Sequence, residues 1–233
     1  MKVMAVGAHP DDIEILCSGT LFRYRESGDE LALCIVTDGA AGHAEIPSED
    51  LSRIRKREAE AAAEILGAKL IWLGLPDERL YDDDPTRMMM VDAVREARPD
   101  IIISHFAEDY HHDHRSVARL VYDASFIASL PNIRTAHPSH DLVPAFYEMD
   151  TLAGVGFSPD EYVDISETLS LKLKMLSCHK SQIKWLKDHD QIDIMDFITT
   201  VARFRGLQCG VNYAEAFRLK KAWPRIPTRR LLP

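Results

Sequence analysis

The chain is poor in cysteine, and its cysteines do not have the spacing of a redox or metal-binding pair. Four of the 233 residues are cysteine, and none of them form a C-x-x-C pair. Three of the four lie among apolar neighbours. This pattern indicates reduced, mostly buried thiols and a cytoplasmic protein rather than a disulfide framework.

Positive charge and long apolar runs are also scarce. Lys and Arg number 28 against 37 Asp and Glu, which gives a net charge of −9. Such a surface repels phosphates and anionic lipids, so nucleic acid and membrane surfaces are not expected as partners. No apolar run reaches the length of a membrane span. The first apolar run ends at His9, which is too early for a signal peptide.

What the chain does have is a regular alternation of apolar strands and helical patterns. Strands are expected at 2–8, 31–36, 69–73 and 100–104, and helices at 12–27, 48–66, 86–97 and 115–130. Continuously apolar strands that alternate with helices predict an α/β, Rossmann-like three-layer fold with a mostly parallel central sheet and helices on both faces.

The second half of the chain is less regular. It predicts an edge strand at 145–149 and helices at 167–186 and 192–207. No repeat or linker divides the sequence, so we expect a single domain over 1–233. Residues 1–130 would form the half that carries a metal site, and residues 131–233 would supply substrate-pocket loops, helices and a C-terminal tail.

Two clusters of imidazoles and carboxylates lie about a hundred residues apart. His9-Pro10-Asp11-Asp12 follows the first strand, and His111-His112-Asp113-His114 follows the fourth. Thr37-Asp38-Gly39 follows the second strand. Because ligands bind beyond the carboxyl ends of parallel strands, all three segments are expected at one edge of the sheet. Histidine and carboxylate are the ligands of zinc and similar metals, so the pattern predicts a metal site.

Each cluster taken alone has a simpler explanation. Asp11 and Asp12 suit the start of a helix, and three histidines suit a solvated loop. A nucleotide-binding fold is disfavoured, because the first turn has no G-x-G-x-x-G and its two carboxylates would repel a pyrophosphate.

At these residues the sequence resembles the PIG-L/LmbE family of zinc-dependent N-acetylglucosamine-type de-N-acetylases. The resemblance rests on Ala8-His9-Pro10-Asp11-Asp12 with Glu14, and on His111-x-Asp113-His114. Further matches are Thr37-Asp38-Gly39, Arg55-x-x-Glu58, and Tyr213-Ala214-Glu215. His112 stands where the family often has proline.

The resemblance implies a role for each matched side chain. His9, Asp12 and His114 would bind Zn²⁺, although Fe²⁺ or another divalent metal suits the same ligands. Asp11 would be the general base, and His111 would stabilise the oxyanion as a histidinium. Asp113 would lie behind His111 and orient it.

The implied activity is hydrolysis of the N-acetyl group of an amino sugar or an N-acetylglucosamine conjugate, giving acetate and a free amine. Arg55, Asp38 and His43 are candidate substrate contacts, and for Arg55 a surface ion pair with Glu58 is an equal alternative. A hydrolase of another amide or ester, and a non-catalytic sugar-binding module, remain alternatives. A homo-oligomer is expected. The arginine-rich tail at 222–233 would lie against a neighbouring subunit, with a frayed terminus as the alternative.

Overall fold

The computed structural model describes residues 1–225, which form seven strands and eight helices. In chain order the elements are β1 (Lys2–Gly7), α1 (Asp12–Leu16), α2 (Ser18–Glu26), β2 (Glu30–Thr37), α3 (Ser48–Leu66), β3 (Lys69–Leu75), α4 (Asp84–Ala97), β4 (Ile101–Ser104), α5 (His112–Ile127), β5 (Ala145–Met149), β6 (Glu161–Asp164), α6 (Leu169–Leu176), α7 (Lys180–His189), α8 (Ile194–Cys209) and β7 (Ala214–Leu219). The predicted tail contact lies almost wholly outside the described residues.

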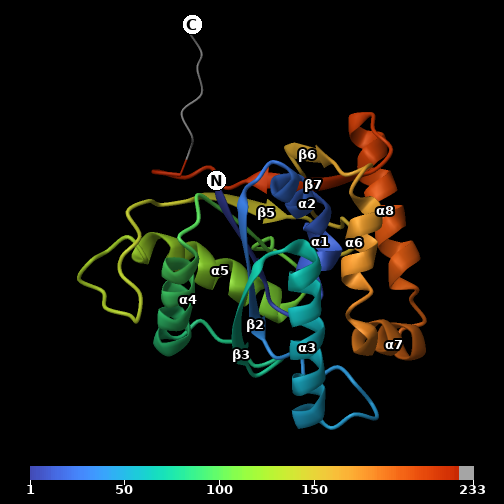
Figure 1. Ribbon diagram of the computed structural model, residues 1–233, viewed down its shortest axis with the longest axis horizontal. Helices are drawn as coiled ribbons and strands as arrows, with labels where there is room; N and C mark the ends of the chain where they lie inside the picture. The colour runs from blue at the N-terminus through green and yellow to red at the C-terminus, as the bar shows by residue number, and fades with distance from the viewer. Residues whose placement is uncertain (226–233) are drawn as a thin grey trace, which may run out of the picture.

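All seven strands belong to one mixed sheet with the order β3-β2-β1-β4-β5-β7-β6 (Figure 1). Strands β1 to β5 are parallel, whereas β7 is antiparallel to both β5 and β6. β1 lies between β2 and β4, with Val6 opposite both Cys34 and Ser104. The segments that follow these three strands therefore leave the sheet at the same edge.

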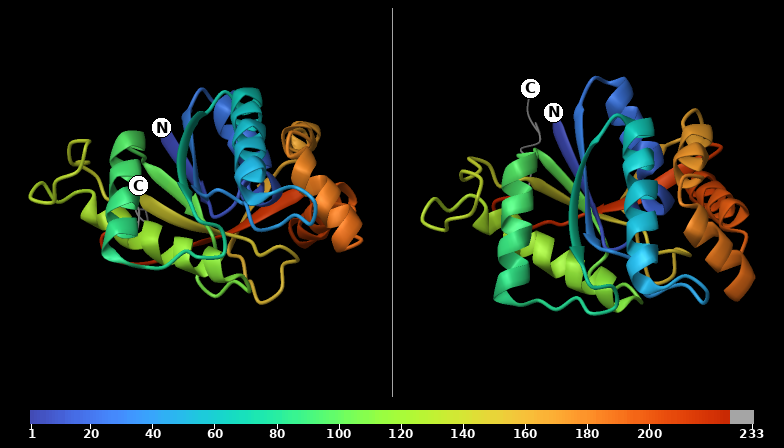
Figure 2. Two further views of the ribbon diagram at one scale, coloured as in Figure 1. Left: turned by 90° about the horizontal axis from the view of Figure 1, so that it is seen from below. Right: turned by 60° about the horizontal axis from the view of Figure 1, so that its bottom comes forward.

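Helices cover both faces of the sheet, as the sequence predicts (Figure 2). On one face, α4 and α5 pack apolar side chains such as Met90 and Leu120 against residues such as Val6 and Cys34. On the other face, α1, α2, α3 and α6 pack against alternate residues of the same strands, such as Ala5. A third, smaller cluster forms between α6, α7 and α8 around Leu176, Ile194 and Ile198. The α/β, three-layer prediction is confirmed.

Three predicted elements differ from those observed, and two observed strands were not predicted. The helix expected at 12–27 is two helices, because Cys17 leaves helical geometry with φ −145°. The helix expected at 167–186 divides into α6 and α7, because the backbone of His179 leaves helical geometry (φ −82°, ψ 60°). β5 is not an edge strand, because it lies between β4 and β7. The pair that displaces it from the edge, β6 and β7, was not predicted.

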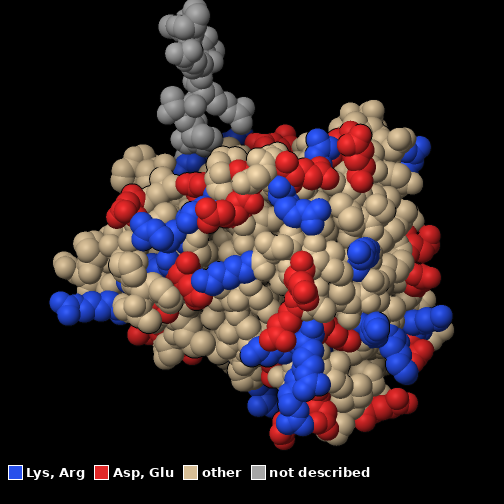
Figure 3. Space-filling model, in the orientation of Figure 1, with Lys and Arg blue, Asp and Glu red and all other residues tan. Residues whose placement is uncertain are grey.

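Charges of both signs share the visible surface. Figure 3 shows Lys and Arg side chains beside Asp and Glu, as on α3, where Arg53 pairs with Glu49 and Asp50. In the part of the chain that the structure describes, no helix is long and apolar enough to cross a bilayer.

Candidate active site

The first site segment is the turn between β1 and α1. Asp12 Oδ2 accepts a hydrogen bond from the backbone N–H of His9 at 2.7 Å, which closes the turn on itself. The turn also forces Asp11 into a left-handed conformation with φ 114°, a conformation that non-glycine residues rarely adopt. Asp11 occupies the N-cap position of α1, but its side chain makes no capping hydrogen bond. Helix capping therefore does not explain this carboxylate.

The second segment is the loop from β4 into α5. His111 is the N-cap residue of α5, and its Nδ1 accepts a hydrogen bond from the backbone N–H of Asp113 at 3.2 Å. His114 lies in the first turn of the same helix and is buried. Upstream in the loop, the buried carboxylate of Asp109 accepts from the backbone N–H of His111 at 2.9 Å.

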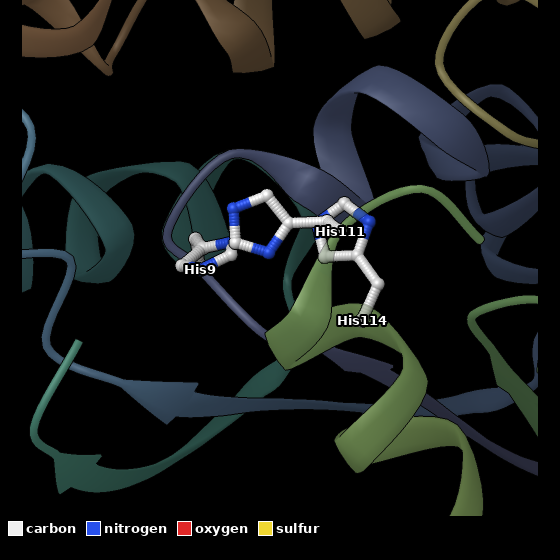
Figure 4. Close-up of side chains that lie close together, drawn as sticks. All are labelled: His9, His111 and His114. Atoms are coloured by element: carbon white, nitrogen blue, oxygen red, sulfur yellow. The ribbon is translucent and has the colours of Figure 1, made fainter. Parts of the chain in front are cut away.

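The structure brings the two segments together (Figure 4). His114 Nε2 lies 3.2 Å from Asp12 Oδ1, and His9 Nδ1 lies 3.4 Å from Asp12 Oδ2. The His111 ring centroid lies 4.7 Å from those of both His9 and His114. One ring nitrogen from each of these three histidines lies within 4.8 Å of the other two, as ligands of one ion do. One donor atom each from Asp12, His105 and His114 forms a second group of the same size.

Carboxylates lie behind two of these imidazoles. His114 Nδ1 lies 3.0 Å from Asp109 Oδ1, and His9 Nε2 lies 3.2 Å from Asp77 Oδ1 and 3.3 Å from Asp113 Oδ2. A carboxylate that holds the far nitrogen of an imidazole is typical of histidines that bind metal. Asp113 was expected behind His111, but its carboxylate faces His9, because its side chain also accepts from the N–H of Glu78 at 2.9 Å.

His105 completes the wall behind the cluster. It is fully buried, and its ring stacks on His114 with centroids 3.9 Å apart and an interplanar angle of 12°. Its Nε2 lies 3.0 Å from the backbone nitrogen of Ala8 and 3.1 Å from Asp12 Oδ2. Burial, helped by the charge of His114, lowers the pKa of His105 to about 4, so the ring is neutral near pH 7.

The charges of the cluster offset one another in the metal-free protein. Burial alone would raise the pKa of Asp12, but His114, His105 and His9 hold it well below its ordinary value. Burial alone would lower the pKa of His114, but Asp12 and Asp109 raise it to about 9. The cluster thus holds one firmly ionised carboxylate among imidazoles, which is the donor set of a divalent cation.

Asp11 has a different environment from Asp12. Burial, and then the charge of Asp12, raise the pKa of Asp11 to about 7, although Arg55 and His179 act to lower it. A carboxyl group with that pKa exchanges a proton near neutral pH. Two adjacent aspartates therefore have separate chemical properties, one fit to bind a cation and the other fit to move a proton.

His111 is poised as a hydrogen-bond donor. Because its Nδ1 accepts from the N–H of Asp113, its proton in the neutral form is on Nε2, which lies 3.2 Å from Glu78 Oε1. Burial and the neighbouring His9 and His114 lower the pKa of His111, which favours the neutral ring. In the metal-free protein the neutral ring is therefore favoured over the histidinium expected from the sequence.

These groups form the polar end of a cavity of about 270 Å³. Its lining comprises His9, Asp11, Asp12, Ile15, Leu16, Gly42, Arg55, Asp77, Glu78, Tyr110, His111, His114, Leu152, Gln182, Trp185, Leu186, Asp190, Ile192, Ile194 and Phe197. Residues from β1–α1, α3, the β4–α5 loop, α7 and α8 therefore converge on one space.

Arg55 is the predicted substrate contact that lies in this cavity. It is only 3% exposed, and its Nη2 donates to Gln182 Oε1 and, at 3.3 Å, to the carbonyl of Gly42. Its expected alternative partner, Glu58, instead accepts from both the N–H and the hydroxyl of Ser181. The surface ion pair is therefore wrong, and α3 holds the start of α7 in place through these contacts.

The other two predicted substrate contacts shape loops instead. Asp38 Oδ1 accepts from the backbone N–H of Ala40 at 3.1 Å and from that of Asp77 at 3.3 Å. His43 Nδ1 accepts from the backbone N–H groups of Glu45 and Ile46, both at 3.1 Å. Neither is among the described residues that line the cavity.

Sequence reasoning did not single out Asp77, His105 and Asp109. Asp77 follows β3 by two residues, and His105 directly follows β4. The rule that strand carboxyl ends share one edge applies to β3 as well, so it could have found Asp77. Asp109 carries no sequence signal of its own, because its role depends on how the loop folds back on His114.

The sequence is similar to those of known proteins along most of its length. Residues 4–125 match the sequence model of the family "PIG-L: GlcNAc-PI de-N-acetylase". The chain is 31% identical over 228 residues to diacetylchitobiose deacetylase of Thermococcus kodakarensis, covering 93% of this chain and 82% of the relative. It is 25% identical to 4-oxalmesaconate hydratase of Pseudomonas putida, covering 97% and 90%.

Among solved structures, N,N'-diacetylchitobiose deacetylase from Pyrococcus horikoshii superimposes with a TM-score of 0.80 at 27% identity. The superposition covers 94% of this chain and 83% of that one. The similarity therefore extends through the second half of the chain, beyond the residues that the family model matches.

Proposed function

The chain belongs to the PIG-L family of GlcNAc-PI de-N-acetylases, and on that basis we propose that it is a metal-dependent hydrolase that removes an N-acetyl group from an amino sugar or N-acetylglucosamine conjugate. The products are acetate and the free amine. The observation that carries this proposal is the placement of the uncapped Asp11 carboxyl group in one cavity with the donors of His9, Asp12 and His114.

His9, Asp12 and His114 would hold the ion, and zinc fits two imidazoles and one carboxylate. The two carboxylate-backed imidazoles support this assignment, because Asp109 and the pair Asp77 and Asp113 fix the orientation of each ring. When bound, a zinc ion in such a site acidifies water and polarises a carbonyl group.

Asp11 acts as the proton carrier of the reaction. Its carboxylate takes a proton from the attacking water, and its carboxylic acid then returns that proton to the departing nitrogen. An amide needs this second step because an unprotonated amine anion is a poor leaving group. The Asp11 carboxyl group suits this role because it lines the cavity and makes no helix-capping hydrogen bond.

His111 acts on the opposite side of the amide. Its Nε2–H donates to the carbonyl oxygen, and this hydrogen bond strengthens as negative charge develops on that oxygen. Removal of one such donor slows comparable hydrolases by about 100- to 1000-fold. Asp113 supports the donor through its backbone N–H, which fixes the His111 tautomer, and supports His9 through its carboxylate.

Arg55 positions Asp11 and reaches the substrate. Its charge lowers the pKa of Asp11, and its side chain lines the cavity. We propose that it donates to a sugar hydroxyl, in exchange for one of its contacts with Gly42 and Gln182.

One of the similar proteins is a hydratase, which is a different activity. The charge of the cavity argues against that activity for this chain. An oxalmesaconate is a polyanion, which needs several cations for binding. The cavity lining contains Asp11, Asp12, Asp77, Glu78 and Asp190, with Arg55 as the single arginine or lysine among the lining residues described. This environment favours a neutral amino sugar.

The proposal is tested by metal analysis of the purified protein together with a hydrolysis screen. N-acetylglucosamine, diacetylchitobiose and other N-acetyl sugars are compared with simple esters and phosphoesters, with added zinc, with added iron(II) and with a chelator. Release of acetate from an N-acetyl sugar, lost with the chelator, supports the proposal. Turnover of phosphoesters alone would replace it with another hydrolase, and sugar binding without turnover would indicate a non-catalytic module.

A further inference from the structure

The cavity has two chemically different ends. Around His9, Asp12 and His114 the lining is polar and charged, whereas the far side is lined by aliphatic and aromatic side chains. On the helices α7 and α8 and the turn between them, these are Trp185, Leu186, Ile192, Ile194 and Phe197. We call the last four, whose side chains have no polar atom, the apolar wall. Ile15, Leu16 and Leu152 continue this surface toward the metal-binding end.

The apolar wall is the cavity-facing side of the third apolar cluster. Ile194 is buried within that cluster, and Leu186 and Phe197 pack against it but remain only partly buried. Ile15 also packs there, one helical turn after Asp11 on α1. The apolar surface therefore begins beside the proposed proton carrier and extends away from it along α8.

A sugar alone is a poor occupant of this end of the cavity. Each sugar hydroxyl that leaves water needs a hydrogen-bond partner, and leaving one unpaired costs about 1–3 kcal/mol. The side chains of the apolar wall offer no partner. Among the lining residues of α7 and the turn after it, the polar side chains are those of Gln182, which is bonded to Arg55, and Asp190, which is exposed. The indole N–H of Trp185 is the remaining side-chain donor there, and it can pair with one hydroxyl at most.

A hydrocarbon group is a good occupant of the same space. Moving it from water onto apolar side chains is favourable by about 0.8 kcal/mol for each buried CH₂ group. The cavity volume of about 270 Å³ lies near the small end of the usual range for ligand pockets. It accommodates one sugar with a short apolar group rather than an oligosaccharide.

We propose that the apolar wall binds a hydrocarbon group of the substrate, so that the protein prefers N-acyl amino sugars that carry one. The inference rests on the proposed function, because it places the amide of the same molecule at His9, Asp12 and His114. The hydrocarbon has two possible sources, either an acyl chain longer than acetyl on the nitrogen or an apolar group on the anomeric oxygen.

Two substrate series distinguish these sources. The first lengthens the acyl group of methyl glucosaminide from acetyl to butanoyl and hexanoyl, and the second lengthens the glycoside of N-acetylglucosamine from methyl to butyl and hexyl. In one of the two series, kcat/KM should rise about fourfold for each added CH₂ until the apolar wall is covered. The series that rises identifies the source.

Substitutions on α8 test whether the apolar wall causes the rise. Phe197→Gln should abolish the dependence on chain length, whereas Phe197→Leu should preserve most of it. Phe204→Ala is the matched control, because Phe204 lies on the same helix, is 49% exposed and is not among the cavity-lining residues. Thermal melts establish that each variant folds, and Leu186→Gln replaces Phe197→Gln if that variant does not fold.

The possible failures can be told apart. If methyl N-acetylglucosaminide is hydrolysed but neither series rises, or if Phe197→Gln keeps the rise, the role of the apolar wall is disproved and the proposed function stands. If no N-acyl amino sugar is hydrolysed with any metal, the proposed function fails and this inference fails with it.

Discussion

Asp11 combines two unfavourable features in one residue. Its backbone is held at φ 114°, and its carboxylate is buried next to that of Asp12. Each feature destabilises the folded chain, and such strain persists where the surrounding structure enforces it, commonly at functional sites. At this residue the strain turns the side chain of Asp11 into the cavity while Asp12 faces the imidazoles.

Replacing Asp11 should separate chemistry from metal binding. Asp11→Asn keeps the shape of the side chain but removes its proton transfer, so kcat should fall about 100- to 10,000-fold. Bound metal, measured by atomic emission, should remain close to one equivalent. Asp12→Asn is the contrasting variant, and it should lose both metal and turnover. Full activity in Asp11→Asn would show that another group carries the proton.

Asp11 should also make the stability of the metal-free protein depend on pH. Its pKa is about 7 when folded against 3.8 as the ordinary value, so the folded state holds the proton more tightly than the unfolded state does. The stabilisation is fully present below about pH 4 and is lost as pH rises through 7, by at most roughly 4 kcal/mol. The measurement is urea unfolding with a chelator present. The free energy of unfolding of Asp11→Asn should exceed that of the wild type at pH 8, and the difference should shrink toward pH 4. A difference that is constant with pH would contradict this explanation.

Asp109 should matter for metal affinity although it is not a proposed ligand. Its Oδ1 lies 3.0 Å from His114 Nδ1 and fixes that ring from behind. Asp109→Asn should therefore weaken metal binding about 10- to 100-fold, as for other carboxylates behind a metal-binding histidine. Competition with a fluorescent chelator measures the change. Asp92→Asn is the control, because Asp92 likewise pairs with a histidine, His137, on a part of the fold that does not line the cavity.

At the scale of elements, periodicity predicted the regular part of the fold. α3 spans the predicted residues 48–66 and ends where Gly67 indicates, because a helix stop at glycine with φ 73° is a local property. Its N-cap residue is Pro47, and no side chain caps that end. β5 was located, but its place in the sheet was not. That place depends on β7, whose six residues pair with strands about 50 to 70 positions away, and such distant pairing leaves little trace in a local pattern.

The buried pair of Lys172 and Glu215 joins α6 to β7 and both to the start of α2. Lys172 Nζ lies 2.5 Å from Glu215 Oε1 and 2.7 Å from the carbonyl of Ile15. Glu215 also accepts from the backbone N–H groups of Gly19 and Thr20 at 2.9 and 2.7 Å. The matched Tyr-Ala-Glu segment thus has a structural role, since Glu215 anchors the helices that follow the β1–α1 turn.

Removing one partner of this pair should destabilise the protein strongly. Lys172→Met leaves the buried Glu215 carboxylate without its cation, and the free energy of unfolding should fall by about 3–5 kcal/mol. Urea unfolding measures the loss, and the double variant Lys172→Met with Glu215→Gln should recover part of it. Lys184→Met removes an exposed pair with Asp188 and should change stability by less than about 1 kcal/mol. If Lys172→Met and Lys184→Met lost the same free energy of unfolding, the buried pair of Lys172 and Glu215 would contribute no more than an exposed pair.

At the scale of the whole molecule, the location of the site was predictable because the carboxyl ends of parallel strands lie at one edge of the sheet. His9 and His114 were expected together from one rule about parallel strands, and the fold places β1 beside β4. The carboxylates behind the imidazoles and the apolar wall were not predictable, because they depend on loop paths and on α7 and α8. Three inferences remain predictions: the roles assigned to the site residues, a single domain over 1–233, and a homo-oligomer. Light scattering measures the oligomeric state.

Metal removal should lower the stability of the whole fold. The proposed ligands come from the β1–α1 turn and from α5, so only the folded chain presents them together. At a free metal concentration about 1,000 times the dissociation constant, binding stabilises the folded state by roughly 4 kcal/mol. Calorimetry with and without a chelator should show a lower Tm for the metal-free protein. His114→Ala should melt at the same temperature in both conditions, and a chelator effect that persists in this variant would indicate another metal site.

The separation of His9 and Asp12 from His114 along the chain also sets the order of events during synthesis. The opening turn leaves the ribosome about a hundred residues before His114 does. Until then the nascent chain offers two of the three proposed donors. Loading of the cation therefore belongs to a late stage of biogenesis, after the first half of the polypeptide has emerged and closed on itself.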